Sequence, residues 1–224
     1  IYEQEKSLNG LASIYNLLGA CCFYKQELEK AEHHFLESKR YHLQTGNRLK
    51  LTHVNHNLGL LNESLFQWEK AQLYYEENLT LSREMQNPKI EGFTLNQSAS
   101  LLIKQRQLEP ALQYLSLAER LLQNETDSRG LAYVFVNRGF IQFLIQDLDA
   151  AENDLLKAYA MFKELNDVMG LDRSMIRLGH LYAEKRDFNQ ALFYYHLCQN
   201  ARERLDRKRQ DGMERLFNAL GIVA

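Results

Sequence analysis

The chain repeats itself with a period of forty residues, and successive rows of forty align without a gap. Two columns of small residues carry the repeat. One column is always alanine and the other is glycine with one exception: Ala31, Ala71, Ala111, Ala151 and Ala191 in the first, and Gly19, Gly59, Ala99, Gly139 and Gly179 in the second. A period between twenty and fifty residues is typical of repeat arrays, in which each unit must stack on its neighbours to bury its apolar face. We therefore expect an elongated array rather than one compact core.

Each row is expected to contain two helices. The 224 residues include only two prolines and eleven glycines. Apolar residues recur at helical spacing in two blocks per row, for example within residues 134–145 and 148–162. This spacing is typical of amphipathic helices. The sequence therefore predicts an all-α fold of helical hairpins, without strands.

Short polar residues recur where these helices are expected to begin, and such side chains often cap helix N-termini. One column precedes the first helix of each repeat and another precedes the second: Asn47, Asn87, Asp127 and Asp167 in the first column, and Glu27, Gln67, Gln107, Asp147 and Asp187 in the second. Pro88 follows Asn87 at the first helical position, where a missing N–H costs little.

The glycine and alanine columns are twelve residues apart, and we expect them to lie where the two helices of a repeat cross. Only a small side chain lets two helix axes approach closely. Helix propensity alone could explain one alanine, but five alanines in register indicate a packing requirement.

Together these columns resemble the tetratricopeptide repeat. The resemblance is carried by the Leu-Gly pairs, the alanine column, an aromatic or leucine four residues later, and a further small residue: Leu18-Gly19, Leu58-Gly59 and Leu178-Gly179; Phe35, Tyr75, Leu115, Leu155 and Tyr195; Ser38, Ala118, Ala158 and Cys198. The forty-residue period is similar to that of the subgroup found in kinesin light chains, spindle-orientation adaptors and sensor domains of bacterial regulators. The resemblance implies a right-handed α–α superhelix of antiparallel helix pairs.

The same alignment predicts how the chain is divided. Residues 11–210 would form five tandem repeats, residues 1–10 would end a preceding repeat, and residues 211–224 would start the first helix of a further repeat. From this division we expect the chain to be a piece of a longer protein.

In the family, the first helix of each repeat lines a concave groove that binds partner chains. The position two residues before the glycine column holds Leu17, Asn57, Gln97, Asn137 and Arg177. Carboxamides offer both a donor and an acceptor, so the three consecutive amides could hold the backbone of an extended peptide. The alternative is that these amides only bond to a neighbouring helix.

Other residues are predicted to face the groove by the same resemblance: His53, His56, Phe93, Asn96, Tyr133, Phe140, Phe143, Arg173 and His180. Aromatic side chains would form pockets for partner side chains, although Phe140 and Phe143 could equally belong to the core between repeats.

Two arginines are similar to half of the carboxylate clamp of chaperone-binding members. Arg173 and Arg177, with Asn137, match its second half, whereas Asn96 and Ser100 stand where the first half has lysine and asparagine. We expect an acidic ligand group near the two arginines, but not a chaperone tail.

The leucine of the Leu-Gly pair is replaced by Ser98 in the third repeat and by Arg138 in the fourth. An arginine at a buried position must be paired or must extend its charge to water. We favour compensation, in which the small Ser98 makes room for Arg138, over a flexible joint.

Several classes of function are disfavoured. The formal charge of −2 gives no overall field for nucleic acid or an anionic membrane, and no apolar run is long enough to span a bilayer. The three cysteines lack the spacing of a disulfide framework or metal site, which favours a cytoplasmic location. His53 and His56 are three residues apart, as metal ligands can be, but no third ligand follows. No phosphate loop or nucleophile elbow is present, so we expect no catalytic residues, metal or cofactor.

One basic run, residues 202–209, is expected to be a solvated helix C-terminus, with a patch for an acidic partner as the alternative.

We predict a scaffold that binds an extended segment of a protein or peptide. Two alternatives stay open. One is a ligand-sensing regulatory domain of a larger bacterial signalling protein, such as a transcription activator or nucleotide cyclase. The other is a structural scaffold that forms homodimers through exposed repeat ends.

Overall fold

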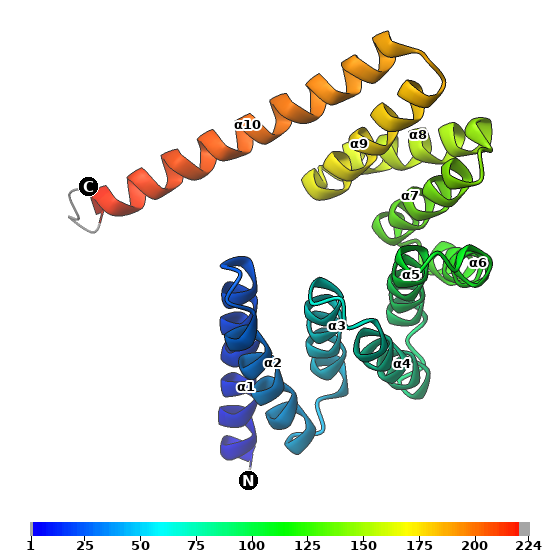
Figure 1. Cartoon of the computed structure of the whole chain (residues 1–224). Coiled ribbons are helices and arrows are strands. Elements are labelled where there is room, and N and C mark those ends of the chain that lie inside the picture. Colours follow the sequence, from blue (N-terminus) through cyan, green and yellow to red (C-terminus); the bar gives the residue numbers. More distant parts are fainter. Residues whose placement is uncertain (1, 220–224) are drawn as a thin grey trace. The chain divides into compact units, whose positions relative to one another are not determined.

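The computed structural model describes the backbone of residues 2–219 and the side chains of residues 7–203. This part of the chain forms ten helices and no strand, as predicted (Figure 1). The helices are α1 (Tyr2–Tyr24), α2 (Leu28–Gln44), α3 (Arg48–Ser64), α4 (Trp68–Glu84), α5 (Pro88–Lys104), α6 (Leu108–Asn124), α7 (Ser128–Leu144), α8 (Leu148–Glu164), α9 (Val168–Glu184) and α10 (Phe188–Ala219). They belong to two compact units, Ile1–Asp127 with α1–α6 and Ser128–Ala224 with α7–α10. Within each unit, consecutive helices pack against each other as hairpins.

The connectors between helices share one backbone conformation. Each is three residues long, and its middle residue has a positive φ, between 51° and 66°. At the end of α3, the N–H of Phe66 donates to Glu63 O at 3.1 Å and the N–H of Gln67 donates to Asn62 O at 2.9 Å. This is the hydrogen-bond pattern of the Schellman motif, which usually has glycine at the left-handed position. Among these connectors only Gly46 is glycine, so the turns could not be predicted from glycine positions.

The predicted N-caps are confirmed for five asparagine and aspartate residues. The Oδ1 atoms of Asn47, Asn87 and Asp167 accept hydrogen bonds at 3.0–3.1 Å from backbone N–H groups three residues later. Asp147 and Asp187 do the same before α8 and α10, at 3.3 and 3.1 Å.

The longer side chains in the same column do not cap. Glu27, Gln67 and Gln107 occupy the N-cap position of α2, α4 and α6, but none accepts a capping hydrogen bond. The prediction was wrong for these three residues because one more methylene carries the oxygen past the N–H groups of the first turn. Glu27 instead forms an ion pair with Lys30 at 2.7 Å.

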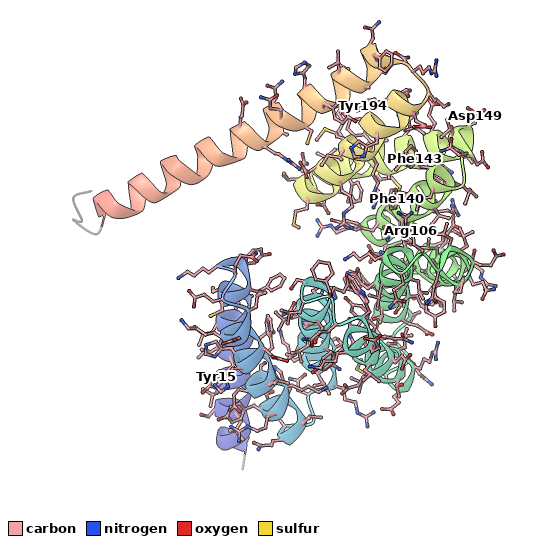
Figure 2. The ribbon with its side chains drawn as sticks, viewed as in Figure 1. Tyr15, Arg106, Phe140, Phe143, Asp149 and Tyr194 are labelled. Carbon is pink, nitrogen blue, oxygen red and sulfur yellow. The ribbon has the colours of Figure 1, made fainter. Side chains whose placement is uncertain are left out.

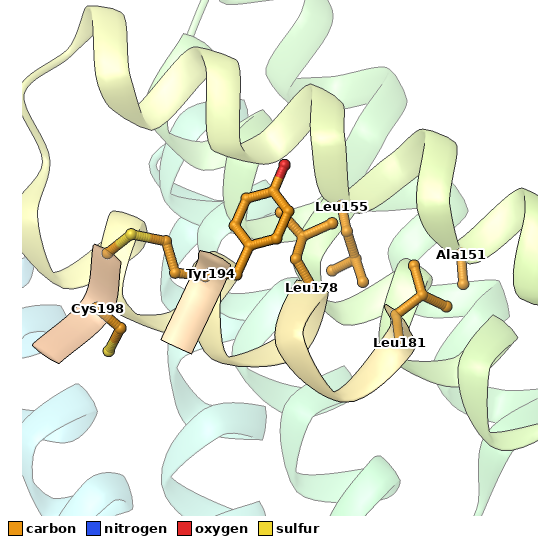
Figure 3. Packing of buried hydrophobic residues seen from close by; sticks show 7 residues of the cluster. Ala151, Leu155, Leu178, Leu181, Tyr194 and Cys198 are labelled. Atoms are coloured by element: carbon orange, nitrogen blue, oxygen red, sulfur yellow. The ribbon is translucent and has the colours of Figure 1, made fainter. Parts of the chain in front are cut away.

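The columns of small residues lie at helix crossings, as predicted. All five alanines of the alanine column are buried. A methyl group at Gly59 would lie 2.4 Å from the ring of Tyr75, and one at Gly179 would lie 2.4 Å from the ring of Tyr195. The glycine therefore makes room for the aromatic or leucine sixteen residues later. Figure 3 shows such packing in the second unit, where Ala151 and Leu155 of α8 meet Leu178 and Leu181 of α9 and Tyr194 of α10.

Arg138 is accommodated by an ion pair within its own repeat. Its guanidinium donates two hydrogen bonds to the carboxylate of Asp154, at 2.6 and 3.0 Å. Asp154 is buried and the Arg138 side chain is 24% exposed. The expectation that this arginine must be paired is confirmed, and compensation by Ser98 is not needed to explain it.

The first and last helices are longer than the others. α1 has 23 residues and α10 has 32, whereas α2–α9 have 17 each. No turn separates residues 2–10 from the rest of α1. The basic run at residues 202–209 lies inside α10 rather than at its C-terminal end, which corrects that expectation. Of residues 211–224, those up to Ala219 continue α10, and residues 220–224 lie outside the described part. Within residues 2–219, none of the helices combines the length and apolar character needed to cross a bilayer.

Candidate binding pocket

A pocket of about 600 Å³ opens in the first unit, between α3 and α5. Four residues that the sequence predicted to face a groove line it, namely His53, His56, Asn57 and Phe93. The other residues of its wall come from α3, α4, α5 and the connectors before α5 and after α6: Leu49, Thr52, Asn78, Asn87, Lys89, Ile90, Thr94 and Asp127. The alternation of helices in the repeat thus places the first helices of two successive repeats on either side of one cavity.

His56 of α3 and Phe93 of α5 contact each other in the wall of this pocket. Their ring centroids are 5.1 Å apart and the rings are inclined by 63°, the edge-to-face geometry that aromatic rings favour. Burial, with a smaller contribution from His53, lowers the pKa of His56 to about 4. His53 is exposed, but partial desolvation beside the pocket, followed by the nearby Lys50, also lowers its pKa. Both imidazoles are therefore mainly neutral at pH 7.

Asn57 is shared between the pocket and a neighbouring helix. Its Nδ2 donates to Asn16 Oδ1 at 2.9 Å, which links α3 to α1. This contact matches the structural alternative for the amide column, but it uses only one N–H of the carboxamide. Among the described residues, its Oδ1 atom and second N–H form no further hydrogen bond. Gln97 of α5 is half-buried, forms no hydrogen bond within the described residues and does not line the pocket.

Asn78 of α4 is a pocket residue that sequence reasoning missed. It is buried, and its Nδ2 donates to the backbone oxygen of Thr52 at 2.9 Å. Asn78 stands in the column where other repeats have a small residue such as Ser38 or Ala118. That departure was the available signal.

Lys89 and Asp127 were also missed as pocket residues. Their side chains form an ion pair at 3.4 Å, with Asp127 15% exposed and Lys89 61% exposed. The sequence predicted Asp127 only as a helix cap. Because the two charges cancel and the histidines are neutral, the pocket lining has no net charge at pH 7.

In the second unit, two predicted arginines lie over two predicted aromatic rings. The guanidinium of Arg177 is 3.7 Å from the ring centroid of Phe140, and that of Arg173 is 5.5 Å from the ring of Tyr133. Burial, followed by the like charge of Arg173, lowers the pKa of Arg177 to about 9. Neither arginine forms an ion pair with a carboxylate among the described side chains. These four residues therefore come together on α7 and α9.

Other predicted residues are less available to a ligand. Asn96 and Asn137 are only 4% and 2% exposed, and each interacts with another residue. Phe143 packs against the core between α8, α9 and α10, and its ring stacks on Phe140 with centroids 6.4 Å apart (Figure 2). For Phe143 the core alternative applies.

His180 is exposed and contacts the ring of Tyr195 at a centroid distance of 5.8 Å. The hydroxyl of Tyr133 lies 3.5 Å from Asp167 Oδ2. Among the described side chains, no three histidine, cysteine, aspartate or glutamate residues gather as ligands for a metal ion.

Family models for the tetratricopeptide repeat match residues 10–84 and 172–204. A search of the curated proteins gave no match. Among solved structures, the chain is similar to BtubC (BKLC) from P. vanneervenii, with a TM-score of 0.72 and 21% identity over 92% of this chain and 85% of that one.

Two further solved structures are similar. A Rap protein complexed with competence and sporulation factor has a TM-score of 0.75 and 16% identity over 85% of this chain. This chain spans 53% of the Rap chain. Aspartyl phosphate phosphatase F from Bacillus subtilis has a TM-score of 0.67 and 14% identity, over 87% of this chain and 60% of that one. At these identities the likeness is one of fold. The chain is therefore an all-α protein with tetratricopeptide repeats at residues 10–84 and 172–204.

Proposed function

We propose that the chain is a protein-interaction scaffold that holds an extended segment of a partner in the pocket between α3 and α5. The observation that carries this proposal is the convergence of His53, His56, Asn57 and Phe93 on one cavity. Their positions in the repeat predict that all four face a groove. Tetratricopeptide repeats support a role in protein interaction, and the pocket supplies a place for it.

The pocket has the size and chemistry of a ligand site. Its volume of about 600 Å³ lies within the range of about 300 to 1,000 Å³ that is usual for ligand sites. The unused Oδ1 and N–H of Asn57 can accept from and donate to the backbone of an extended peptide. Apolar walls around that amide can hold a side chain of the same peptide.

Arg173 and Arg177 are proposed as a second contact, for an acidic group of the partner. Their side chains meet no carboxylate among the described residues, and a ligand carboxylate would offset the unfavourable desolvation of Arg177. This contact is proposed for the second unit alone, independently of the α3–α5 pocket of the first unit.

The alternative of a regulatory domain in a bacterial signalling protein is favoured by the likeness to the Rap protein, whose structure contains competence and sporulation factor. That likeness is one of fold, so the regulatory role is a second proposal. The likeness to aspartyl phosphate phosphatase F is also one of fold, and we propose a non-enzymatic scaffold. The three cysteines are free, in keeping with the proposed cytoplasmic location.

A third proposal is that the chain forms homodimers, and it is supported by an exposed apolar surface on α1. Leu11, Ile14, Leu17 and Leu18 form an exposed apolar stripe on α1, and such stripes are common at interfaces. Analytical ultracentrifugation of the chain and of an Ile14→Lys, Leu17→Glu variant tests it. A dimer that the variant abolishes supports a homodimer through this repeat end, and a monomeric parent chain contradicts it.

The test of the peptide site is selection from a random peptide library displayed on phage, followed by affinity measurement with the synthetic peptides. His53 is exposed and lines the pocket, so His53→Trp is expected to fill the entrance without disturbing the core. His33→Trp is the matched control, because His33 is an exposed histidine of α2 outside the pocket. Peptides that bind the parent chain and the His33→Trp variant, but not the His53→Trp variant, support the proposal. Peptides that bind all three equally contradict it.

A further inference from the structure

We infer that the side chain held in the α3–α5 pocket is large, apolar and uncharged. This inference rests on the proposed function, because it names the ligand class of the same pocket. It follows from the pairing of the charged groups and hydroxyls of the lining within the protein and from the apolar walls that remain.

The two charges of the lining neutralise each other. Lys89 and Asp127 form an ion pair at 3.4 Å. A ligand carboxylate would have to compete with Asp127 for the lysine, and a ligand ammonium would have to compete with Lys89 for the aspartate. Because the Lys89 side chain is largely exposed to water, an ion pair between the ligand and either residue would contribute little binding free energy.

Most uncharged polar groups of the lining are also engaged within the protein. The hydroxyls of Thr52 and Thr94 donate to the backbone oxygens of Leu49 and Ile90, each at 2.8 Å. Asn87 accepts from the N–H of Ile90 at 3.1 Å, and Asn78 donates to the backbone of Thr52. The Asn78 Oδ1 atom has no hydrogen-bond partner, but it is buried. The carboxamide of Asn57 and the rings of His53 and His56 keep polar atoms for a ligand, and those of Asn57 suit the ligand backbone.

The environment of His56 indicates that the inside of the pocket has low polarity. Its half-buried ring lies against Phe93, and burial is the main cause that lowers its pKa to about 4. A group that is kept neutral by burial shows that the site disfavours charge. A charged ligand side chain placed beside His56 would meet the same desolvation without a compensating partner.

The walls that remain are apolar. Leu49 of α3 and Ile90 and Phe93 of α5 line the same cavity. A cavity of about 600 Å³ accommodates the largest side chains together with their flanking backbone. The ligand class is therefore a peptide with a bulky aliphatic or aromatic residue at the position that enters the pocket.

A charge-swap experiment tests this ligand class. Random peptides displayed on phage are selected at pH 7 on the parent chain, on His56→Gln and on His56→Asp. The Gln variant is the uncharged control, and circular dichroism with thermal unfolding checks that both variants fold. The parent and Gln chains are expected to select peptides that share a Leu, Ile, Met, Phe, Tyr or Trp.

Replacing that residue of the synthetic peptide by alanine should weaken binding by about tenfold or more, since the apolar surface of the large side chain is no longer buried. Replacing it by lysine or glutamate should weaken binding further. The Asp variant is expected to bind the apolar peptide about tenfold more weakly and to prefer the lysine version.

The outcomes separate this inference from the proposed function. Peptides that lose binding in His53→Trp but share a charged residue overturn the inference and leave the peptide site in place. Peptides that still bind His53→Trp, or a failure to select any peptide, overturn the proposed site and the inference together.

Discussion

The imidazole of His56 meets the ring of Phe93 edge to face, with centroids 5.1 Å apart. The two residues come from the first helices of successive repeats, α3 and α5, and both line the same pocket. Because this contact spans two repeats, the pocket exists only where the repeats stack. The proposed binding and the repeat packing thus depend on the same side chains.

Phe93→Ala is expected to weaken peptide binding more than it weakens the fold. Phe93 is 38% exposed, so its removal leaves little buried volume. Affinity for a selected peptide should fall roughly tenfold, whereas the unfolding temperature should change by no more than about 3 °C. Fluorescence anisotropy and thermal unfolding measure the two effects. Phe188→Ala, an exposed phenylalanine of α10, is the control and should bind like the parent. Equal losses for both variants would remove Phe93 from the site.

Gly59→Ala is expected to destabilise the chain by about 1–3 kcal/mol. The new methyl group would lie 2.4 Å from the ring of Tyr75, and the Tyr75 hydroxyl is held by a hydrogen bond of 2.6 Å to Glu63. Gly10→Ala is the control, because no atom lies within 4 Å of its Cβ position. That substitution should be neutral or stabilise the helix by up to about 1 kcal/mol. Urea unfolding measures both. Similar effects at the two glycines would show that packing is not the reason for the glycine column.

Removing one partner of the Arg138–Asp154 pair is expected to cost more than removing both. Asp154→Asn leaves a largely buried guanidinium without its carboxylate and should lower the free energy of unfolding by about 3 kcal/mol. Other repeats have leucine and tyrosine at these two positions, as in Leu58 with Tyr74. The double variant Arg138→Leu, Asp154→Tyr should therefore be at least as stable as the parent chain. A double variant less stable than Asp154→Asn contradicts this account of the pair.

The pH dependence of stability should contain a contribution from His56. Its pKa is lowered by burial, with a smaller effect of His53, from the ordinary value of 6.5 to about 4 in the folded chain. The unfolded chain therefore takes up the proton first as the pH falls. The stabilising contribution is complete above pH 6.5 and is lost between pH 6.5 and pH 4.

From pH 7 to pH 4.5, the parent chain should lose about 2 kcal/mol more stability than His56→Gln, which has no titrating group at this position. Urea unfolding at the two pH values measures the difference. Parallel pH profiles for the two chains would mean that the His56 ring is not desolvated in the folded state.

Sequence reasoning predicted those features that repeat from row to row. Helix spacing, the capping role of Asn47 and Asn87, and the close crossing at Gly59 all recur in register, so each could be read from its column. The left-handed turns could not, because residues such as Phe66 and Gln86 adopt a positive φ that tertiary packing imposes against their own preference.

The site was only partly predictable, because a position in the repeat does not fix the exposure of a side chain. Neighbouring residues on a helix point about 100° apart, and this separates the half-buried Gln97 from the buried Asn96. Asn78 and Asp127 reach the pocket from other elements, and Asp154 meets Arg138 from the next helix. Such contacts depend on how the helices pack, which the repeat pattern does not specify.

The most direct measurement of the central claim uses the histidines as reporters. The chain has seven histidines, and His53 and His56 line the pocket whereas His33 and His196 do not. Side-chain NMR spectra are recorded during titration with a selected peptide. The account predicts that the His53 and His56 resonances shift saturably, with the dissociation constant found by anisotropy, while those of His33 and His196 stay in place. Unchanged His53 and His56 resonances at a saturating peptide concentration would contradict it.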